Sequence, residues 1–200
     1  MLVLNLLTIT IENKIKMKGI KFNSEMVNAI LEGRKSQTRI VLNPQPTYIR
    51  NTPFCSSFYD DGHGRCLKSP FGKIGDKLFV KEDFHSRNHY TYSTNNCHKY
   101  TNWEEVSAHF MKQHQSRITL EITDIRVERL ADISEDDCWQ EGGEDMINST
   151  DDLKQCEMAK KLKMCIDDLK PTFATYWNST NKKHKWEDNL FVWVISFKRA

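Results

Sequence analysis

Lys35 and Thr38 stand three residues apart in the stretch LEGRKSQTRI, directly after Gly33, a residue type typical of a helix end. A threonine hydroxyl becomes a good nucleophile only when a nearby base takes its proton, and a buried lysine amine can be that base. Arg34 and Arg39 flank the pair and could donate hydrogen bonds to a substrate oxygen. The spacing also fits a solvated turn, because residues three apart on a regular strand point to opposite faces.

Glu121 is the acidic residue that could complete this set. It lies between Thr119 and Thr123 on the polar face of RITLEITDIRVERL, the segment with the strongest strand pattern in the chain. There its carboxylate could pair with Lys35 or carry a proton to a leaving group. The alternative is that Glu121 belongs to the solvated face of a sheet and has no chemical role.

Two polar segments contain residue types suited to other chemistry. Their cysteines and histidines could bind zinc, but no CxxC pair occurs, so we predict no metal site and no cofactor. Aromatic residues among them could stack nucleobases, although packing is the more ordinary role. The zinc candidates are Cys55, His63, Cys66, Cys97 and His98, and the stacking candidates are Tyr90, Tyr92, Tyr100 and Trp103.

Composition indicates a single globular domain. The 200 residues are 38% hydrophobic and 28% charged, and a net charge of +2 is too small for a large DNA-binding surface that ignores base sequence. Six cysteines without a CxxC pair favour a reduced, cytoplasmic protein. The apolar start MLVLNLL is too short to span a membrane and lacks a basic region, so we predict neither a signal peptide nor a membrane anchor.

The domain is expected to occupy residues 17–200, with residues 1–16 forming either an extension from an upstream start codon or an added edge strand. Two insertions, at about 43–75 and 85–115, have the composition of long loops. A change of phase near Thr123 and Asp124 predicts a β-bulge in the long strand.

Helices and a central strand complete the predicted elements. Ser24 is a suitable N-cap for a short helix that ends at Gly33, and Ser134 is a suitable N-cap for another. An amphipathic helix is predicted over 151–169, with Pro171 in the first turn of the next helix. The final segment LFVWVISF is apolar on both faces, which predicts a central strand covered on both sides.

Taken in order, the blocks GRKSQTRI, GDKLFVKE, SRITLEITDIRVERLADIS, FATYWNST and WEDNLFVWVISFKR resemble ASCH-domain proteins of the kind carried by bacteriophages and prophages. The resemblance covers roughly residues 18 to 199. It implies an α+β, PUA-like fold: a mixed, partly closed β-barrel with flanking helices and a cleft between barrel and helix. The two insertions are the least similar parts.

Some compact bacterial members are similar in the GRK-x-x-T block and remove the acetyl group from N4-acetylcytidine with a lysine, a threonine and a glutamate. On the matching positions, the resemblance implies that Thr38 attacks the acetyl carbonyl and that Lys35 is its base. Glu121 would orient the lysine or protonate the leaving amine, and Arg34 and Arg39 would bind substrate.

The resemblance therefore implies a protein that recognises RNA or a modified nucleoside in its cleft, with hydrolysis of N4-acylcytidine as the leading hypothesis. The alternative is a non-catalytic phage module that binds RNA or a host protein through the same groups. A weaker alternative is a ribonuclease that recruits a histidine from the insertions. We expect no membrane partner and a location in the cytoplasm of a bacterial host.

Overall fold

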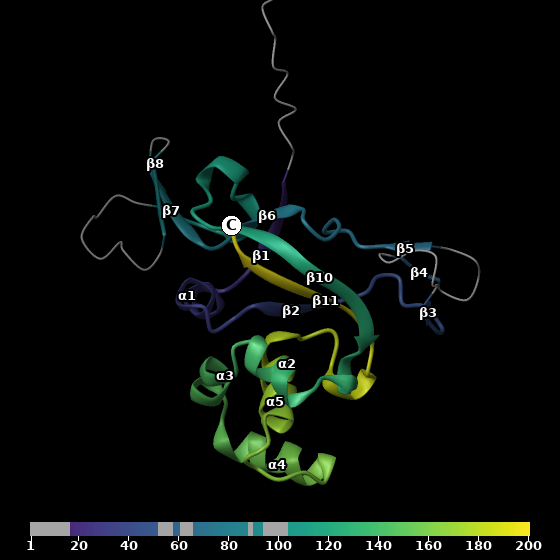
Figure 1. Cartoon of the computed structure of the whole chain (residues 1–200). Coiled ribbons are helices and arrows are strands. Elements are labelled where there is room, and N and C mark those ends of the chain that lie inside the picture. The colour runs from purple at the N-terminus through teal and green to yellow at the C-terminus, as the bar shows by residue number, and fades with distance from the viewer. Residues whose placement is uncertain (1–16, 52–57, 61–65, 88–89, 94–103) are drawn as a thin grey trace, which may run out of the picture.

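The computed structural model describes residues 17–51, 58–60, 66–87, 90–93 and 104–200, and its centre is a mixed five-stranded sheet (Figure 1). The sheet order is β1-β6-β10-β11-β2, with β1 parallel to β6 and every other neighbouring pair antiparallel. Its strands are β1 (Lys18–Lys21), β2 (Gln37–Val41), β6 (Lys77–Lys81), β10 (Thr119–Arg129) and β11 (Phe191–Arg199). The sheet is open, with β1 and β2 as its edges, whereas the resemblance implied partial closure into a barrel.

Among the described residues, five helices flank this sheet, which confirms the predicted α+β class. Helices α2 to α5 gather on one side of the sheet, and α1 lies beside β2 (Figure 1). The bounds are α1 (Ser24–Glu32), α2 (Glu135–Gln140), α3 (Gly143–Ser149), α4 (Asp152–Leu162) and α5 (Leu169–Thr180). Short 3-10 turns cover 108–110, 113–115, 130–132 and 186–188.

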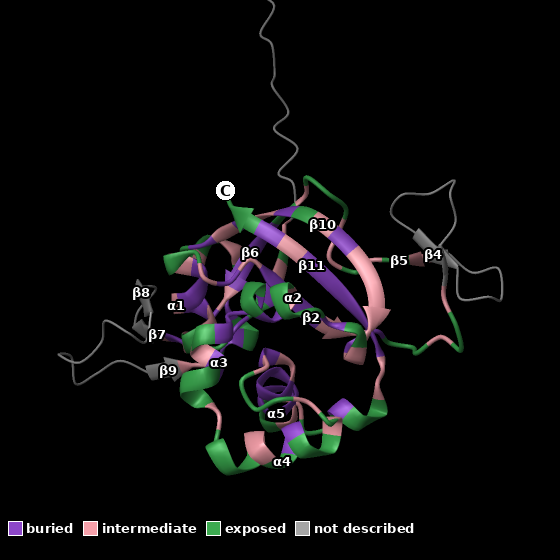
Figure 2. Cartoon of the chain, turned by 60° about the horizontal axis from the view of Figure 1, so that its bottom comes forward, coloured by how far each residue is buried: buried purple, intermediate pink, exposed green. Residues whose placement is uncertain are grey.

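The core has two parts, one on each face of β11. Trp193, Ile195 and Phe197 pack into a cluster with α1, β1, β6 and β10. Val192 and Val194 point to the other face and pack against the α2–α5 helices. Figure 2 shows β11 and α5 as largely buried elements. The prediction of a central strand covered on both sides is therefore confirmed.

The predicted bulge is also present, because the β10 register against β11 shifts between Ile122 and Asp124. The helix predicted over 151–169 is instead divided. Lys163 adopts the left-handed conformation, with φ 56°, and ends α4. The next helix begins at Leu169, with Pro171 in its first turn as predicted. Amide hydrogens in the first turn have no partner within the helix, so a proline, which has no amide hydrogen, is tolerated there.

The two insertions contain short sheets rather than loops alone. The first holds β3 (Arg50–Asn51), β4 (Phe58–Asp60) and β5 (Cys66–Lys68); the second holds β7 (Phe84–Arg87), β8 (Tyr90–Ser93) and β9 (Glu104–Val106). Strands of two to four residues are too short to show an alternating pattern in the sequence. Residues 1–16, Cys55, His63, Cys97, His98, Tyr100 and Trp103 lie outside the described residues.

Candidate functional site

A tight turn after α1 places Lys35 inside the protein. Gly33 ends α1 in the left-handed conformation, with φ 81°, which lets the chain reverse without a side-chain clash. The Lys35 amide then donates to the Ala29 carbonyl at 3.1 Å, and the Ser36 amide donates to the Gln140 carbonyl at 2.9 Å, which joins the turn to α2. The Lys35 side chain has 0% exposure, so the solvated-turn interpretation is wrong.

Glu141 is the partner of this buried lysine. The Lys35 Nζ donates to the Glu141 Oε2 at 2.7 Å and to the Glu141 backbone carbonyl at 2.8 Å. The Glu141 side chain is only 5% exposed, so both members of the ion pair are shielded from water. A buried ion pair of this kind survives only with good geometry and further hydrogen bonds, and Arg39 supplies one more.

Arg39 holds the other oxygen of Glu141, at 3.1 Å, and is saturated with acceptors. A guanidinium has five N–H donors, and all five are used within the described structure. The remaining acceptors are Glu128 Oε1 (from Nε at 3.1 Å and Nη2 at 2.5 Å), Asp137 Oδ2 (from Nη2 at 2.9 Å) and Gln37 Oε1 (from Nη1 at 2.7 Å). Arg39 thus has no donor left for a substrate, and its predicted binding role becomes that of a clamp on Glu141.

The charges around this clamp keep Arg39 and Asp137 ionised. Burial opposes the charge of Arg39, but Glu141, Glu128 and Asp137 raise its pKa above the ordinary value. Burial likewise favours protonated Asp137, but Arg39, the Gln37 amide and Arg126 lower the pKa of this carboxyl below its ordinary value. Arg39 and Asp137 therefore both remain charged at neutral pH.

Replacing Arg39 by lysine should lower the free energy of unfolding by about 2–4 kcal/mol, because an ammonium cannot reach all four acceptors. Chemical denaturation at neutral pH measures the loss. The matched control is Arg34→Lys, whose side chain is 28% exposed and which should change stability by less than about 1 kcal/mol. Equal losses in the two variants would show that Arg39 is not a clamp.

The lowered pKa of Asp137 predicts a specific sensitivity to acid. The group favours the folded state above about pH 4, and this contribution disappears as the pH falls through the lower folded-state pKa. The free energy of unfolding should therefore fall less steeply below about pH 4 in Asp137→Asn than in the wild type. Denaturation curves recorded between neutral and acidic pH test this, with the exposed Asp132→Asn as a control that should keep the wild-type slope.

Arg34 and Glu121, the other two predicted site residues, lie elsewhere. Arg34 pairs with Glu32 at 2.6 Å and with Asp145, which ties the end of α1 to α3. Glu121 stands opposite Lys198 on β11 and pairs with its ammonium at 3.2 Å, with 33% of the glutamate side chain exposed. Among the described contacts, neither residue reaches the Lys35 ammonium, so the structure does not bring Glu121 into the predicted set.

A cavity of about 190 Å³ opens beside Glu141, between the free edge of β2, the β1–α1 junction and α5. Its polar lining includes Thr38, Glu141 and Tyr176. Within the described structure the Thr38 hydroxyl has no hydrogen-bond partner, so it is available to a ligand. Its apolar lining includes Phe22, Ile40 and Trp177. The cavity thus places a hydroxyl and a carboxylate between flat apolar walls.

Tyr176 supplies a neutral donor to the same cavity. Burial raises the pKa of its phenol, so the hydroxyl keeps its proton at neutral pH. That oxygen accepts a hydrogen bond from the Asn23 side chain at 3.4 Å, which leaves the phenol hydrogen free for a ligand. The Asn23 side chain is itself held in place, because its Oδ1 caps α1 by accepting a hydrogen bond from the Met26 backbone amide at 2.8 Å. Sequence analysis had placed this cap at Ser24.

Sequence analysis missed Glu141 and Tyr176. Glu141 lies within an acidic segment, SEDDCWQEGGED, in which no spacing distinguishes one carboxylate from another. The useful signal is electrostatic: a lysine predicted to be buried needs a carboxylate, and this acidic run is the densest in the chain. Tyr176 was hidden in a helix whose pattern explains an aromatic residue as packing alone.

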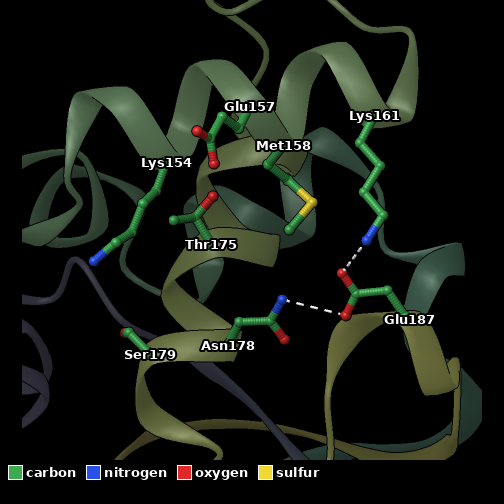
Figure 3. Close-up of a pocket in the computed structure, with 8 residues that line it drawn as sticks. All are labelled: Lys154, Glu157, Met158, Lys161, Thr175, Asn178, Ser179 and Glu187. Carbon is green, nitrogen blue, oxygen red and sulfur yellow. Dashed lines mark hydrogen bonds and ion pairs between the residues drawn. The ribbon is translucent and has the colours of Figure 1, made fainter.

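A larger cavity lies elsewhere, between α4 and α5, with a volume of about 390 Å³ (Figure 3). Its polar groups largely satisfy one another. The Lys161 ammonium pairs with Glu187 at 2.5 Å, the Asn178 amide donates to Glu187 at 3.4 Å, and the Thr175 hydroxyl donates to the Pro171 carbonyl at 2.8 Å. Because it holds no buried ionisable pair and no free nucleophile, we place the chemistry at the smaller cavity.

Cys138 does not compete with Thr38 as a nucleophile. Cys138 is buried against the same helices, and burial raises the pKa of its thiol to about 12, which makes it a poor nucleophile. Among the described residues, no three His, Cys, Asp or Glu side chains are grouped to hold a metal ion. In the same residues, none of the helices is long and apolar enough to cross a membrane.

Comparison with known proteins finds similar solved structures. No family model matches the sequence, and no curated protein matches it. A structure of a DUF984 protein from Enterococcus faecalis V583 is 10% identical, with a TM-score of 0.41, over 92% of this chain and 76% of that one. An ASCH domain structure from Lactobacillus crispatus JV V101 is 12% identical, with a TM-score of 0.36, over 92% of this chain and 79% of that one.

Proposed function

We propose that the protein hydrolyses an N-acyl group from a modified nucleobase, with N4-acetylcytidine as the representative substrate. The observation that supports this most strongly is the unpartnered Thr38 hydroxyl in a cavity whose carboxylate, Glu141, is paired with the buried Lys35 ammonium. The proposal keeps the lysine and threonine of the sequence resemblance and takes Glu141 as the carboxylate in place of Glu121. The resemblance of the GRK-x-x-T block to amidohydrolases supplies the substrate class.

The first half of the reaction forms an acyl-threonine. When a ligand excludes water from the cavity, the Lys35 proton passes to Glu141, because a neutral pair is favoured in a dry environment. The neutral amine then takes the Thr38 proton while Oγ1 bonds to the acyl carbon. As the C–N bond breaks, the leaving amine takes the proton held by Glu141, which restores the ion pair.

The second half repeats these proton movements with water. Lys35 again passes its proton to Glu141, takes a proton from water, and the hydroxide bonds to the acyl carbon. The Thr38 oxygen leaves with the proton from Glu141, and a carboxylic acid is released. Each side chain ends the cycle in its starting state, so no cofactor is required.

The size and lining of the cavity support a flat, small ligand. At about 190 Å³ it is smaller than the roughly 300–1,000 Å³ typical of sites for drug-sized molecules. Phe22 and Trp177 provide aromatic surface for a planar ring, and the Tyr176 phenol can donate to a ring nitrogen or a carbonyl oxygen. A pyrimidine carries such acceptors on its edge.

Thr38→Val tests the nucleophile, because it removes the hydroxyl and preserves the shape of the side chain. Release of cytidine from N4-acetylcytidine, followed by chromatography, should fall on the order of a thousandfold or more. Thr38→Ser keeps a hydroxyl and should keep measurable turnover. Wild-type rates in Thr38→Val would contradict a covalent role for this residue.

A non-catalytic binding module remains the second candidate. Two observations favour it: every N–H donor of Arg39 is already used, and Lys35 donates two hydrogen bonds to Glu141. These contacts can hold a rigid binding pocket without any reaction. Cytidine that binds to the wild type, with no release from any N4-acylcytidine, would decide for this candidate. The ribonuclease alternative needs a histidine from the insertions, and none lines the cavity in the part of the chain described.

A further inference from the structure

We propose that the cavity mouth carries a phosphate subsite formed by Lys21 on one side and by Lys182 and Lys183 on the other. The ligand would then be a nucleotide, free or within an RNA chain, rather than a nucleoside without phosphate. This inference rests on the proposed function, because it concerns a group attached to the ligand of the same cavity.

The placement of the three lysines is the first argument. Lys21 ends β1, is exposed, and is itself part of the cavity lining. On the opposite side, Thr180 and Asn181 line the cavity at the end of α5, and Lys182 and Lys183 follow directly in the chain as exposed residues. The two basic groups of residues therefore come from the two elements that bound the cavity.

The turn that carries Lys182 and Lys183 is firmly attached to the cavity wall. The Trp177 indole, part of that wall, donates to the His184 carbonyl at 2.8 Å, and the Asn181 amide donates to the Trp177 carbonyl at 2.8 Å. On the far side of the turn, the Lys185 ammonium donates to the Asn178 carbonyl at 3.0 Å. A pre-ordered backbone lowers the entropy lost when its side chains bind a ligand.

The charges of this subsite are not used within the described structure. Lys21, Lys182 and Lys183 have no ion pair among the described residues, in contrast to Lys161 and Lys198, which each hold a glutamate. Lysine ammonium groups are common phosphate binders, and contacts of this kind position a nucleic acid without reading its sequence. A chain with a net charge of only +2 can still carry such a local basic site.

A structural role is the competing explanation, because lysines just beyond a helix end also interact favourably with the helix dipole. The double variant Lys182→Gln/Lys183→Gln separates the two roles. Its matched control is Lys160→Gln/Lys163→Gln, which removes two exposed lysines at the end of α4 that do not line the cavity. A dipole role predicts similar losses of stability in both variants and no effect on ligand affinity.

The experiment compares the affinity of the full chain for cytidine, cytidine 5′-monophosphate and a short single-stranded oligoribonucleotide by calorimetric titration. We expect the phosphorylated ligands to bind at least about tenfold more tightly than cytidine. High salt and the Lys182→Gln/Lys183→Gln variant should each reduce this difference in affinity, and the Lys160→Gln/Lys163→Gln control should retain it. The ratio between monophosphate and oligoribonucleotide distinguishes a free nucleotide from an RNA chain.

Equal affinity for cytidine and its monophosphate, or equal losses in the two double variants, would overturn the phosphate subsite while leaving the proposed function intact. If none of the three ligands binds and N4-acetylcytidine is not hydrolysed, the proposed function fails, and the subsite fails with it.

Discussion

Glu141→Gln is expected to reduce turnover of N4-acetylcytidine on the order of a hundredfold to ten-thousandfold. The variant should also lose about 3–5 kcal/mol of unfolding free energy, the usual effect of breaking a buried ion pair. Both effects follow from the same geometry. Glu141 accepts from Lys35 with one oxygen and from Arg39 with the other, whereas an amide offers one acceptor and turns a donor toward a cation.

The matched control is Glu121→Gln. It makes the same chemical change at the carboxylate that sequence analysis favoured, which is one-third exposed and pairs with Lys198. We expect near wild-type turnover and a change in unfolding free energy of less than about 1 kcal/mol. Steady-state kinetics and chemical denaturation measure both quantities. A large kinetic loss in Glu121→Gln, with little change in Glu141→Gln, would reverse the assignment.

Lys35→Arg is expected to eliminate detectable turnover while cytidine binding persists. An arginine preserves the positive charge beside Glu141, but its guanidinium stays protonated and cannot take a proton from Thr38. Turnover should also disappear in Lys35→Ala, which in addition leaves Glu141 without its ammonium partner. Comparing the two variants distinguishes the role of Lys35 as a base from its role as a positive charge beside Glu141.

Rates and binding are measured on the same preparations, by chromatography of released cytidine and by calorimetry. The control is Lys198→Ala, which removes an exposed lysine that pairs with Glu121 and should leave turnover unchanged. Substantial turnover in Lys35→Arg would show that Lys35 supplies charge and not a base. The stability of Lys35→Arg should lie between those of the wild type and Lys35→Ala.

The elements that position the site could largely be predicted from the sequence. Gly33 ends α1 as expected, the bulge lies between Ile122 and Asp124, and the final strand is covered on both faces. Each of these depends on residues close together in the chain, where spacing and backbone preference carry the information. Lys35 and Thr38 were proposed as site residues from their residue types and their place just after the turn that ends α1.

The partner of Lys35 could not be predicted in this way. Glu141 is separated from Lys35 by 106 positions, and its place depends on how α2 packs against the turn before β2. The resemblance assigned this role to Glu121 on the long strand, but the strand register sets that residue opposite Lys198. Arg39 was assigned to the substrate because a sequence does not show that four acceptors already surround the guanidinium.

The most direct test of the account is to mix the wild-type chain with N4-acetylcytidine, quench the reaction, and analyse the nucleoside by chromatography and the intact protein by mass spectrometry. The account predicts cytidine release and a transient acetyl group on Thr38, with both signals absent in Thr38→Val. Cytidine that binds in the cavity while N4-acetylcytidine stays intact and Thr38 unmodified would contradict the account and identify the site as a binding pocket.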